Sequence, residues 1–223
     1  MPIIGIIGRI GSGKDTIAQM IIDESAKEHG WEIKKFAGKL KEIVALLTGC
    51  KVQDLENEQF KNSDLPEQWA KYRLLDFMRD TGTVYPDVTS SEVYAPKSNS
   101  QHVYTVRREI MTYRKLLQVL GTEALRDLIH PNVHVNALMS QYHPNLSSWI
   151  VTDVRFPNEG DAIKNAGGWL VKAERPGISH GTHPSETSMD DYKSIDFTIR
   201  NIGDLVYLRR GVNEVYSEIK KHL

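Results

Sequence analysis

The sequence predicts an α/β fold in which a parallel sheet is flanked by helices on both faces. Three observations support this prediction. Short apolar runs rich in β-branched residues alternate with helical apolar stripes at both ends of the chain, as they do in chains built from strand–helix units. A glycine-rich stretch joins the first run to the first stripe. The middle of the chain, from about residue 38 to 147, has a mostly helical pattern and interrupts that alternation.

The composition is that of an ordinary globular protein with one sizeable domain. The chain has 223 residues, of which 40% are hydrophobic and 26% charged. Its formal net charge of −1 provides no overall field for polyanions, so we expect no direct nucleic-acid binding. The single cysteine, Cys50, excludes an intrachain disulfide. There is no bilayer-length apolar run or secretory-signal pattern, so we expect no membrane contact and a cytoplasmic protein.

The first elements follow from the apolar pattern of the N-terminal part. Residues 3–7 form a β-branched run typical of a central parallel strand. Helical spacing then predicts a helix from near Gly13 to about Gly30. The segment at 31–37 is a candidate second strand, and apolar residues spaced along 40–47 predict a second helix.

The middle of the chain is less regular. Residues 80–104 are rich in Ser, Thr, Pro and Asn, which predicts an exposed loop or a small hairpin. A strong helix is expected from Thr112, with its apolar stripe on Leu116, Leu117, Leu120, Ala124 and Leu128. A further helix is expected at 133–142.

The alternation resumes in the C-terminal part. Strands are predicted at 148–154, 169–175 and 195–201, and helices at 158–168 and 205–219. We therefore expect one domain over 1–223, with its core in 1–37 and 148–223 and a mostly helical insert at 38–147.

A phosphate-binding loop is predicted between the first strand and the first helix. Gly8, Gly13 and Lys14 match the Gly-xxxx-Gly-Lys spacing, and both flanks fit. Backbone N–H groups at Gly11, Ser12 and Gly13 would face an ATP phosphate, and Lys14 would follow the transferred phosphoryl group.

The residues after Lys14 depart from the common motif, because Asp15 precedes Thr16. The hydroxyl group of Thr16 is a candidate Mg²⁺ or phosphate ligand. Asp15 is a candidate for orienting a Mg²⁺-bound water, and a simple helix-capping role is an equal alternative.

A second substrate carrying a phosphate needs cations. Lys39 opens a helix after a strand, and Arg114 opens another. Gln118 lies four residues after Arg114, on the same helical face, where it can hydrogen-bond a base. For Lys39 and Arg114 a solvated surface position is an alternative. For other cations of this region we expect that surface position, namely for Lys41, Lys115 and Arg126.

Further candidates follow the C-terminal strands. Asp153 ends an apolar strand, where it can hold Mg²⁺ through water or contact the acceptor, and Arg155 can reach the transferring phosphoryl group. A structural pair between these two is the alternative. Arg175 ends the next strand, and Asn201 and Gly203 follow the last one, where backbone groups can contact adenine; a helix start at Asn201 is the alternative.

The polar segment after Arg175 contains His180, His183 and Glu186. It can form a flexible cover over the phosphates. His-x-x-His alone is a weak zinc signal.

Several of these segments together resemble the bacteriophage deoxynucleoside monophosphate kinases, a branch of the P-loop nucleoside monophosphate kinases. The resembling segments are "GRIGSGKDT", "FAGKLKEI", "RKLLQVLGTEALRD", "IVTDVRFPNEGDAIKNAGGWLVKAERPG", "THPSE" and "IRNIGDL". The resemblance implies ATP- and Mg²⁺-dependent phosphorylation of a deoxynucleoside monophosphate to the diphosphate. It also implies the P-loop kinase fold, with the insert at 38–147 binding the acceptor and a short lid at about 176–192. If a phage encodes the chain, the expected location is the cytoplasm of the host cell. The matching lysine and arginine positions would be Lys14, Arg114 and Arg155.

The expected mechanism is direct in-line transfer from ATP. Lys14 holds the donor phosphates, Asp153 contributes to the metal or acceptor site, and Arg155 and Arg175 offset charge in the transition state. The expected partners are ATP and a deoxynucleoside monophosphate, and a homodimer is left open. Two alternatives stay open from the sequence, a kinase resembling dephospho-coenzyme A kinase and a non-catalytic nucleotide-binding regulator. The preferred base is not fixed by these residues.

Overall fold

The computed structural model describes residues 2–25, 30–76, 89–92, 104–146, 148–178 and 183–223. The chain divides into two compact units, one formed by Met1–Leu40 with Gly121–Leu223 and the other by Lys41–Leu120. We call the first the core unit and the second the inserted unit. In the part of the chain that the structure describes, no helix is both long and apolar enough to cross a membrane.

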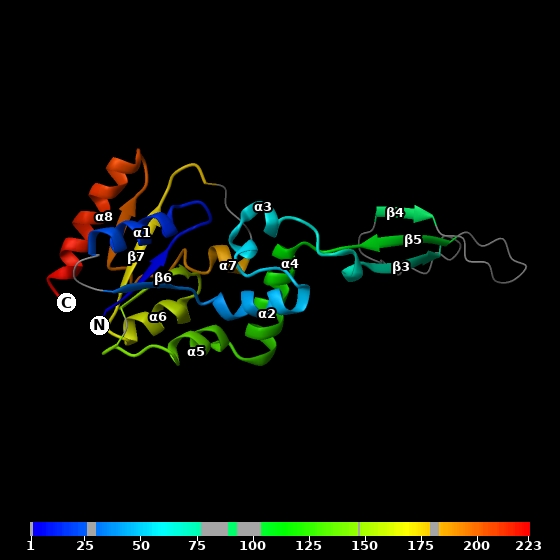
Figure 1. Cartoon of the computed structure of the whole chain (residues 1–223), viewed down its shortest axis with the longest axis horizontal. Coiled ribbons are helices and arrows are strands. Elements are labelled where there is room, and N and C mark those ends of the chain that lie inside the picture. The colour runs from blue at the N-terminus through cyan, green and yellow to red at the C-terminus, as the bar shows by residue number, and fades with distance from the viewer. Residues whose placement is uncertain (1, 26–29, 77–88, 93–103, 147, 179–182) are drawn as a thin grey trace, which may run out of the picture. The chain divides into compact units, whose positions relative to one another are not determined.

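The core unit contains a five-stranded sheet, and every strand pair in it is parallel. The strand order is β2-β6-β1-β7-β8, and Figure 1 labels β6 and β7 of this sheet. The strands are β1 (Ile3–Ile7), β2 (Trp31–Lys34), β6 (Ser148–Val154), β7 (Trp169–Glu174) and β8 (Phe197–Arg200). All five strands predicted from the sequence are confirmed. The carboxyl ends of β1, β6 and β7 therefore meet at one edge of the sheet, where open α/β sheets bind ligands.

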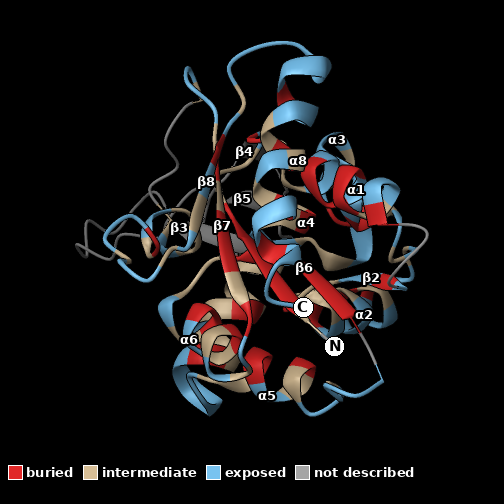
Figure 2. Ribbon diagram, turned by 90° about the vertical axis from the view of Figure 1, so that its left-hand side faces the viewer, coloured by how far each residue is buried: buried red, intermediate tan, exposed pale blue. Residues whose placement is uncertain are grey.

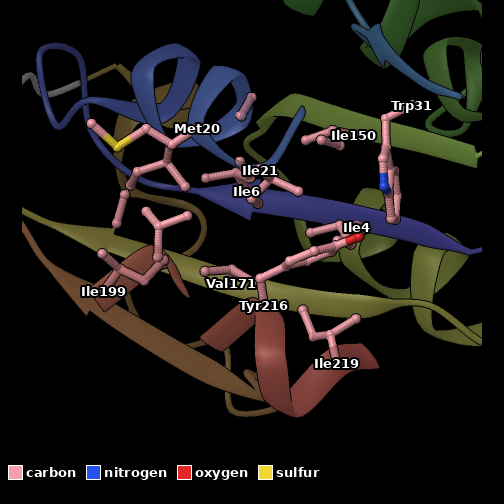
Figure 3. Packing of buried hydrophobic residues seen from close by; sticks show 14 of the residues in the cluster. Ile4, Ile6, Met20, Ile21, Trp31, Ile150, Val171, Ile199, Tyr216 and Ile219 are labelled. Carbon is pink, nitrogen blue, oxygen red and sulfur yellow. The ribbon is translucent and has the colours of Figure 1, made fainter. Parts of the chain in front are cut away.

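Helices cover both faces of this sheet. Successive strand residues point to opposite sides, and in β1 the residues on both sides are buried. Figure 2 shows α1 (Lys14–Ser25) and α8 (Leu205–Lys220) on one side, and α5 (Val133–Met139) and α6 (Pro157–Asn165) on the other. Ile4 and Ile6 of β1 belong to the hydrophobic cluster on the α1–α8 side, and Ile3 and Ile7 to the other cluster. Figure 3 shows the first cluster, in which strand residues pack against Ile21 of α1 and against Tyr216 and Ile219 of α8.

The predicted helices of the core unit are present, with short differences at their ends. The last helix begins at Leu205, and Asp204 caps it by accepting a hydrogen bond from the N–H of Tyr207 at 2.8 Å. A helix start at Asn201 is therefore wrong. The predicted lid contains a short helix, α7 (Pro184–Thr187), and its residues 179–182, which include His180, lie outside the described residues.

The helix predicted from Thr112 changes its type along its length. Thr112 caps α4 (Tyr113–Gln118), and the helix continues as η3 (Val119–Ile129), a π-helix. In a π-helix the hydrogen bonds join residues five apart, so a stripe spaced at 3.6 residues does not stay on one face. Leu128, which the sequence places on the apolar stripe, is 83% exposed. Arg126, which the sequence places at the surface, is buried. Both predictions are wrong.

The inserted unit has its own helices and a small sheet. The helix α2 (Gly38–Thr48) leads into it, and η1 (Asp54–Glu56), α3 (Glu58–Lys61), η2 (Glu67–Trp69) and α4 follow or close it. The strands β3 (Lys71–Asp76), β4 (Thr89–Glu92) and β5 (Tyr104–Glu109) pair antiparallel in the order β3-β5-β4. The segment predicted as a loop or small hairpin, 80–104, falls mostly outside the described residues, and β4 is the described part within it together with the first residue of β5.

Candidate functional site

The loop between β1 and α1 depends on glycine at two positions. Gly11 and Gly13 have φ angles of 79° and 95°, in the left-handed region that L side chains rarely adopt. A Cβ on Gly13 would also lie 2.7 Å from the amide nitrogen of Asn201. The N–H of Ser12 donates to the carbonyl of Arg9 at 3.1 Å and tightens the turn. The strand and the helix that the glycine motif requires on either side are both present.

Lys14 reaches back across this loop from the first residue of α1. Its Nζ donates to the carbonyl oxygens of Gly8 and Arg9, at 2.7 Å each. Burial is the main cause that lowers the pKa of Lys14 to about 8, and the guanidinium group of Arg155 lowers that pKa further. An anion beside the ammonium group would offset both effects, because a nearby negative charge favours the charged form. The lysine is thus held where it can exchange two neutral carbonyl partners for phosphate oxygens.

A cavity of about 490 Å³ lies beside the loop. Its walls come from the glycine loop, the ends of β6 and β7, α7 and the segment after β8. This volume lies within the range of small-molecule sites. The cavity therefore lies at the carboxyl edge of the sheet, beside the phosphate-binding motif.

Two arginines on the cavity wall pair with carboxylates from α7 and the turn after it. Arg9 donates to both carboxylate oxygens of Asp190 at 3.0 Å. Arg155 donates to the carboxylate of Glu186 and, at 3.3 Å, to the carbonyl of Ser185. The predicted alternative of a pair between Arg155 and its neighbour two residues earlier is not the arrangement found. The guanidinium N–H groups that donate to these carboxylate oxygens can donate to phosphate oxygens as well.

Arg175 and Asn201 hold the loop from the other strands. Arg175 donates to the carbonyl of Gly11 at 3.1 Å, and the side-chain amide of Asn201 donates to the carbonyl of Ser12 at 3.1 Å. Arg175 also lines the cavity, and Gly203 follows Asn201 in the exposed segment before α8. The structure therefore brings Arg175 and Asn201 to the same loop as Lys14.

Asp153 has backbone partners. Its two carboxylate oxygens accept hydrogen bonds from the N–H groups of Phe36 (2.8 Å) and Ala37 (3.0 Å), in the turn between β2 and α2. Lys39 is exposed in the first turn of α2, two residues after that turn. Asp153 thus fixes the backbone from which Lys39 projects.

The oxygen donors expected to bind a metal lie at the surface of α1 and at the end of β6. Asp15 is exposed, with the ammonium group of Lys35 at 3.7 Å, and Thr16 is exposed beside it. Among the described residues, no group of three or more His, Cys, Asp or Glu side chains is arranged to hold a metal ion.

The two other acceptor candidates lie on α4, in the inserted unit. Arg114 donates to the carboxylate of Glu58 and, through Nε, to the side-chain oxygen of Asn62 at 2.7 Å. Gln118 is the last residue of α4 and is partly exposed.

The site contains residues that the sequence reasoning missed. It assigned no role to Arg9, although this residue lies inside the glycine motif, or to Asp190. Of the three cations expected at the surface, Lys115 is exposed, Lys41 pairs with Glu56 at 2.7 Å, and Arg126 is buried.

Arg126 pairs with Glu159 at 2.8 Å, and both side chains are buried. The other oxygen of Glu159 accepts hydrogen bonds from the N–H groups of Arg155 (2.8 Å) and Phe156 (3.1 Å). Burial is the main cause that raises the pKa of Glu159 to about 7; Asp153 raises that pKa as well, while Arg126 and the amide of Arg155 lower it. The only sequence signal for this glutamate is its place at the third position of a helix that begins with proline.

Comparison with known proteins identifies the family. A sequence model described as "Deoxynucleotide monophosphate kinase" matches residues 52–212, which is more than half of the chain. The chain belongs to this family. It is 29% identical over 233 residues to a protein of Acanthamoeba polyphaga mimivirus named "Putative deoxynucleotide monophosphate kinase", with 98% of this chain and 94% of the relative covered. It is 27% identical over 219 residues to the "Deoxynucleoside-5'-monophosphate kinase" of Escherichia phage T5, with 84% of each covered.

Membership confirms several predictions from the sequence. The resemblance to the phage kinases is confirmed, as are the P-loop kinase fold and deoxynucleoside monophosphate kinase activity. ATP use follows from that activity. The alternatives of a coenzyme A-type kinase and of a non-catalytic regulator are therefore set aside. The roles of the individual residues are a separate question.

Proposed function

We propose that the cavity beside the glycine loop binds the ATP phosphates, and that their γ-phosphoryl group passes in line to a deoxynucleoside monophosphate. The observation behind this proposal is the position of Lys14, which spans the glycine loop on two carbonyl contacts at 2.7 Å. Positive φ angles at Gly11 and Gly13 keep side chains out of the loop. Loop N–H groups and the positive end of α1 then favour a polyphosphate.

In this proposal the phosphate oxygens bind at the positions that the carboxylates near α7 occupy. Glu186 and Asp190 give Arg155 and Arg9 anionic partners on the cavity wall. Phosphate groups also present pairs of oxygen acceptors and carry more charge, so they replace these carboxylates when ATP enters. The exchange frees α7 to adjust over the bound donor, which is the role expected of the lid at about 176–192.

The chemistry needs no nucleophile from the protein. An oxygen of the acceptor monophosphate attacks the γ-phosphorus of ATP, and the bond from that phosphorus to the β–γ bridging oxygen breaks. The products are ADP and a deoxynucleoside diphosphate. Lys14 follows the transferring group, and Arg155 and Arg175 offset the charge that develops on it. Positioning and electrostatic stabilisation supply most of the rate.

The acceptor is bound, in our proposal, by Lys39, Arg114, Gln118 and Asp153. Arg114 contacts the acceptor phosphate in exchange for Glu58, and Gln118 hydrogen-bonds the base. Asp153 contributes by holding the turn at Phe36 and Ala37, from which Lys39 reaches the phosphate.

Magnesium fits the donor set. The hydroxyl group of Thr16 and the carboxylates of Asp15 and Asp153 are hard oxygen donors, as Mg²⁺ prefers, and the last two would act through water. Since the described side chains form no cage of three carboxylates, the ion would be bound largely by the ATP phosphates, which is usual for Mg²⁺ in kinases. When bound, the ion neutralises charge on the β- and γ-phosphates.

The test is a pair of lysine variants. Lys14→Ala should lower turnover about a hundredfold or more, because it removes a charge aimed at the transferring group, and the fold should persist. Lys221→Ala, which breaks an exposed pair with Glu218 on the last turn of the chain, is the matched control and should keep full turnover. Acceptors are dTMP, dGMP, dCMP, dAMP, the matching ribonucleotides and dephospho-coenzyme A. Near-normal turnover of Lys14→Ala with any acceptor would contradict the proposed donor site.

Two further properties belong to this proposal. We expect the reaction in the cytoplasm, where ATP and deoxynucleoside monophosphates are dissolved. A homodimer stays a prediction, and analytical ultracentrifugation at micromolar concentration tests it.

A further inference from the structure

Arg126 lies at the centre of a buried set of contacts that no assigned role uses. Its Nη2 donates to Oε1 of Glu159 at 2.8 Å, and its Nη1 donates to the carbonyl of Pro131 at 3.0 Å and to Oδ1 of Asn158 at 3.3 Å. Its guanidinium carbon lies 3.7 Å from the centroid of the Phe156 ring. Arg126 therefore joins η3, the turn before α5 and the start of α6.

Glu159 links Arg126 to the backbone of Arg155 through hydrogen bonds. One carboxylate oxygen binds Arg126, and the other accepts the N–H groups of Arg155 and Phe156. Phe156 is held twice, through its amide by Glu159 and through its ring by the guanidinium group. The main chain at 155–156 is thus fixed from its buried side, while the Arg155 side chain points to the cavity wall.

We propose that Arg126 is a positioning residue that sets the place of the Arg155 guanidinium group through Glu159 and Phe156. This inference rests on the proposed function, in which Arg155 contacts the transferring phosphoryl group. A shift of about 1 Å in a group aligned with the reacting atoms can lower turnover about a hundredfold. Arg126 is too buried to touch ATP itself, with 8% of its surface exposed.

The π-helix supplies the reason why an arginine can occupy this position. Within η3 the buried residues are Gly121 and Arg126, five residues apart, which matches the i→i+5 spacing. The carbonyl of Leu125 accepts the N–H of His130 at 3.0 Å in the same register. A regular α-helix would turn position 126 away from this face. π-Helical turns are frequently found at functional sites, and here the turn places a positively charged group behind Arg155.

The experiment is a double-mutant cycle between Arg126 and Arg155. Turnover, the KM for each substrate and the amide NMR signals of residues 155 and 156 are measured in Arg126→Lys, Arg126→Met, Arg155→Met and the double variant. Lys164→Met is the matched control, because it breaks another ion pair of α6, with Asp196 at 2.7 Å, without contacting Arg155. Arg126→Lys keeps a charge next to Glu159 and serves in the cycle if Arg126→Met does not fold.

The expected result is a loss of turnover that depends on Arg155. Arg126→Met should lower kcat about ten- to a hundredfold with little change in either KM, and Arg126→Lys should recover part of the loss. In the Arg155→Met background the same change should have almost no further effect on kcat, since residues that act as a unit are not additive. The two amide signals should shift in both Arg126 variants and stay in place in Lys164→Met.

Two failures are distinguishable. If the Arg126 change lowers kcat by the same factor in both backgrounds, or if the two amide signals do not move, the positioning role is wrong. If Arg155→Met keeps full turnover, the proposed role of Arg155 in transfer is wrong, and the NMR shifts then report separately whether Arg126 fixes that backbone.

Discussion

The arginine–carboxylate pairs on the cavity wall and the pair at the start of α6 differ in their access to water. The side chains are 28% and 50% exposed in the Arg9–Asp190 pair, and 30% and 13% exposed in the Arg155–Glu186 pair. In the Arg126–Glu159 pair they are 9% and 3% exposed. An exposed pair contributes about 0–1 kcal/mol to stability, whereas breaking a buried pair from one side costs about 3–5 kcal/mol. The same two chemical groups therefore suit opposite roles.

The difference shows how the backbone of Arg155 can be held in place while its side chain exchanges one partner for another. Water reaches the Arg155 side chain, so a phosphate can replace its carboxylate partner at little cost. The amide of the same residue is held by Glu159, which is 2% exposed and cannot be replaced by a ligand. A guanidinium group that is free to change partners is thus carried on a backbone that stays in place.

Glu159→Ala should have the largest effect on stability, because it breaks the buried pair and leaves the pairs on the cavity wall intact. This change leaves the Arg126 guanidinium group buried without its carboxylate and frees two backbone N–H groups, so the free energy of unfolding should fall by about 3–5 kcal/mol. Urea unfolding followed by circular dichroism measures it. Glu186→Ala, in the pair that water still reaches, should lower that free energy by less, about 1 kcal/mol. Equal losses in the two variants would show that burial does not distinguish these pairs.

Stability should also depend on pH through Glu159. Burial raises the folded-state pKa to about 7, from an ordinary value of 4.5, so the folded state binds the proton more tightly than the unfolded state. The stabilisation by this proton is fully present below pH 4.5 and is lost as the pH rises to about 7. Gln at position 159 does not titrate, so the free energy of unfolding of the unmodified chain minus that of Glu159→Gln should fall from pH 4.5 to 7. A rise in that quantity over the same window would mean that Arg126 and the amide of Arg155 outweigh burial.

Much of the core unit follows from the sequence, because its signals are local. The β-branched runs at Ile3–Ile7 and Ser148–Val154 are strands buried on both faces, and the glycine spacing places Lys14 at the start of α1. The cluster of Lys14, Arg155 and Arg175 could also be expected, since each follows the carboxyl end of a neighbouring parallel strand.

The rest of the site depends on contacts between segments far apart in the chain. Nothing local shows that Asp190 meets Arg9, 181 residues away, or that Asp153 binds the turn at Phe36 and Ala37. The stripe that includes Leu128 assumes a period of 3.6 residues, which does not hold in a π-helix, and Arg126 is buried although an arginine is ordinarily solvated. Sequence periodicity assumes one helix type throughout, and a change of type moves every later residue to another face.

A smaller effect, on binding rather than stability, is expected for Glu186→Gln. The change removes an anion that competes with phosphate for Arg155 and keeps the size of the side chain. The dissociation constant for ATP with Mg²⁺ should fall by up to about fivefold, the equivalent of the roughly 1 kcal/mol that an exposed pair contributes. Calorimetric titration measures it, and Glu218→Gln, in the exposed pair with Lys221, is the matched control. Weaker ATP binding by Glu186→Gln would mean that the carboxylate helps to hold the donor instead of giving way to it.

The smallest effect should come from Asp190→Asn, because water reaches Asp190 most readily. Its side chain is 50% exposed, against 13% for Glu186, so solvent already screens much of its attraction to Arg9. We expect the ATP dissociation constant to fall less than about twofold, and the change to disappear near 1 M salt, where screening acts over about 3 Å. The effect of Glu186→Gln should survive that salt better, since a partly buried pair is screened less. If Asp190→Asn instead tightened ATP binding more than Glu186→Gln, exposure would not predict the size of these effects on ATP affinity. Arg9, inside the glycine loop, would then contribute more to triphosphate binding than Arg155.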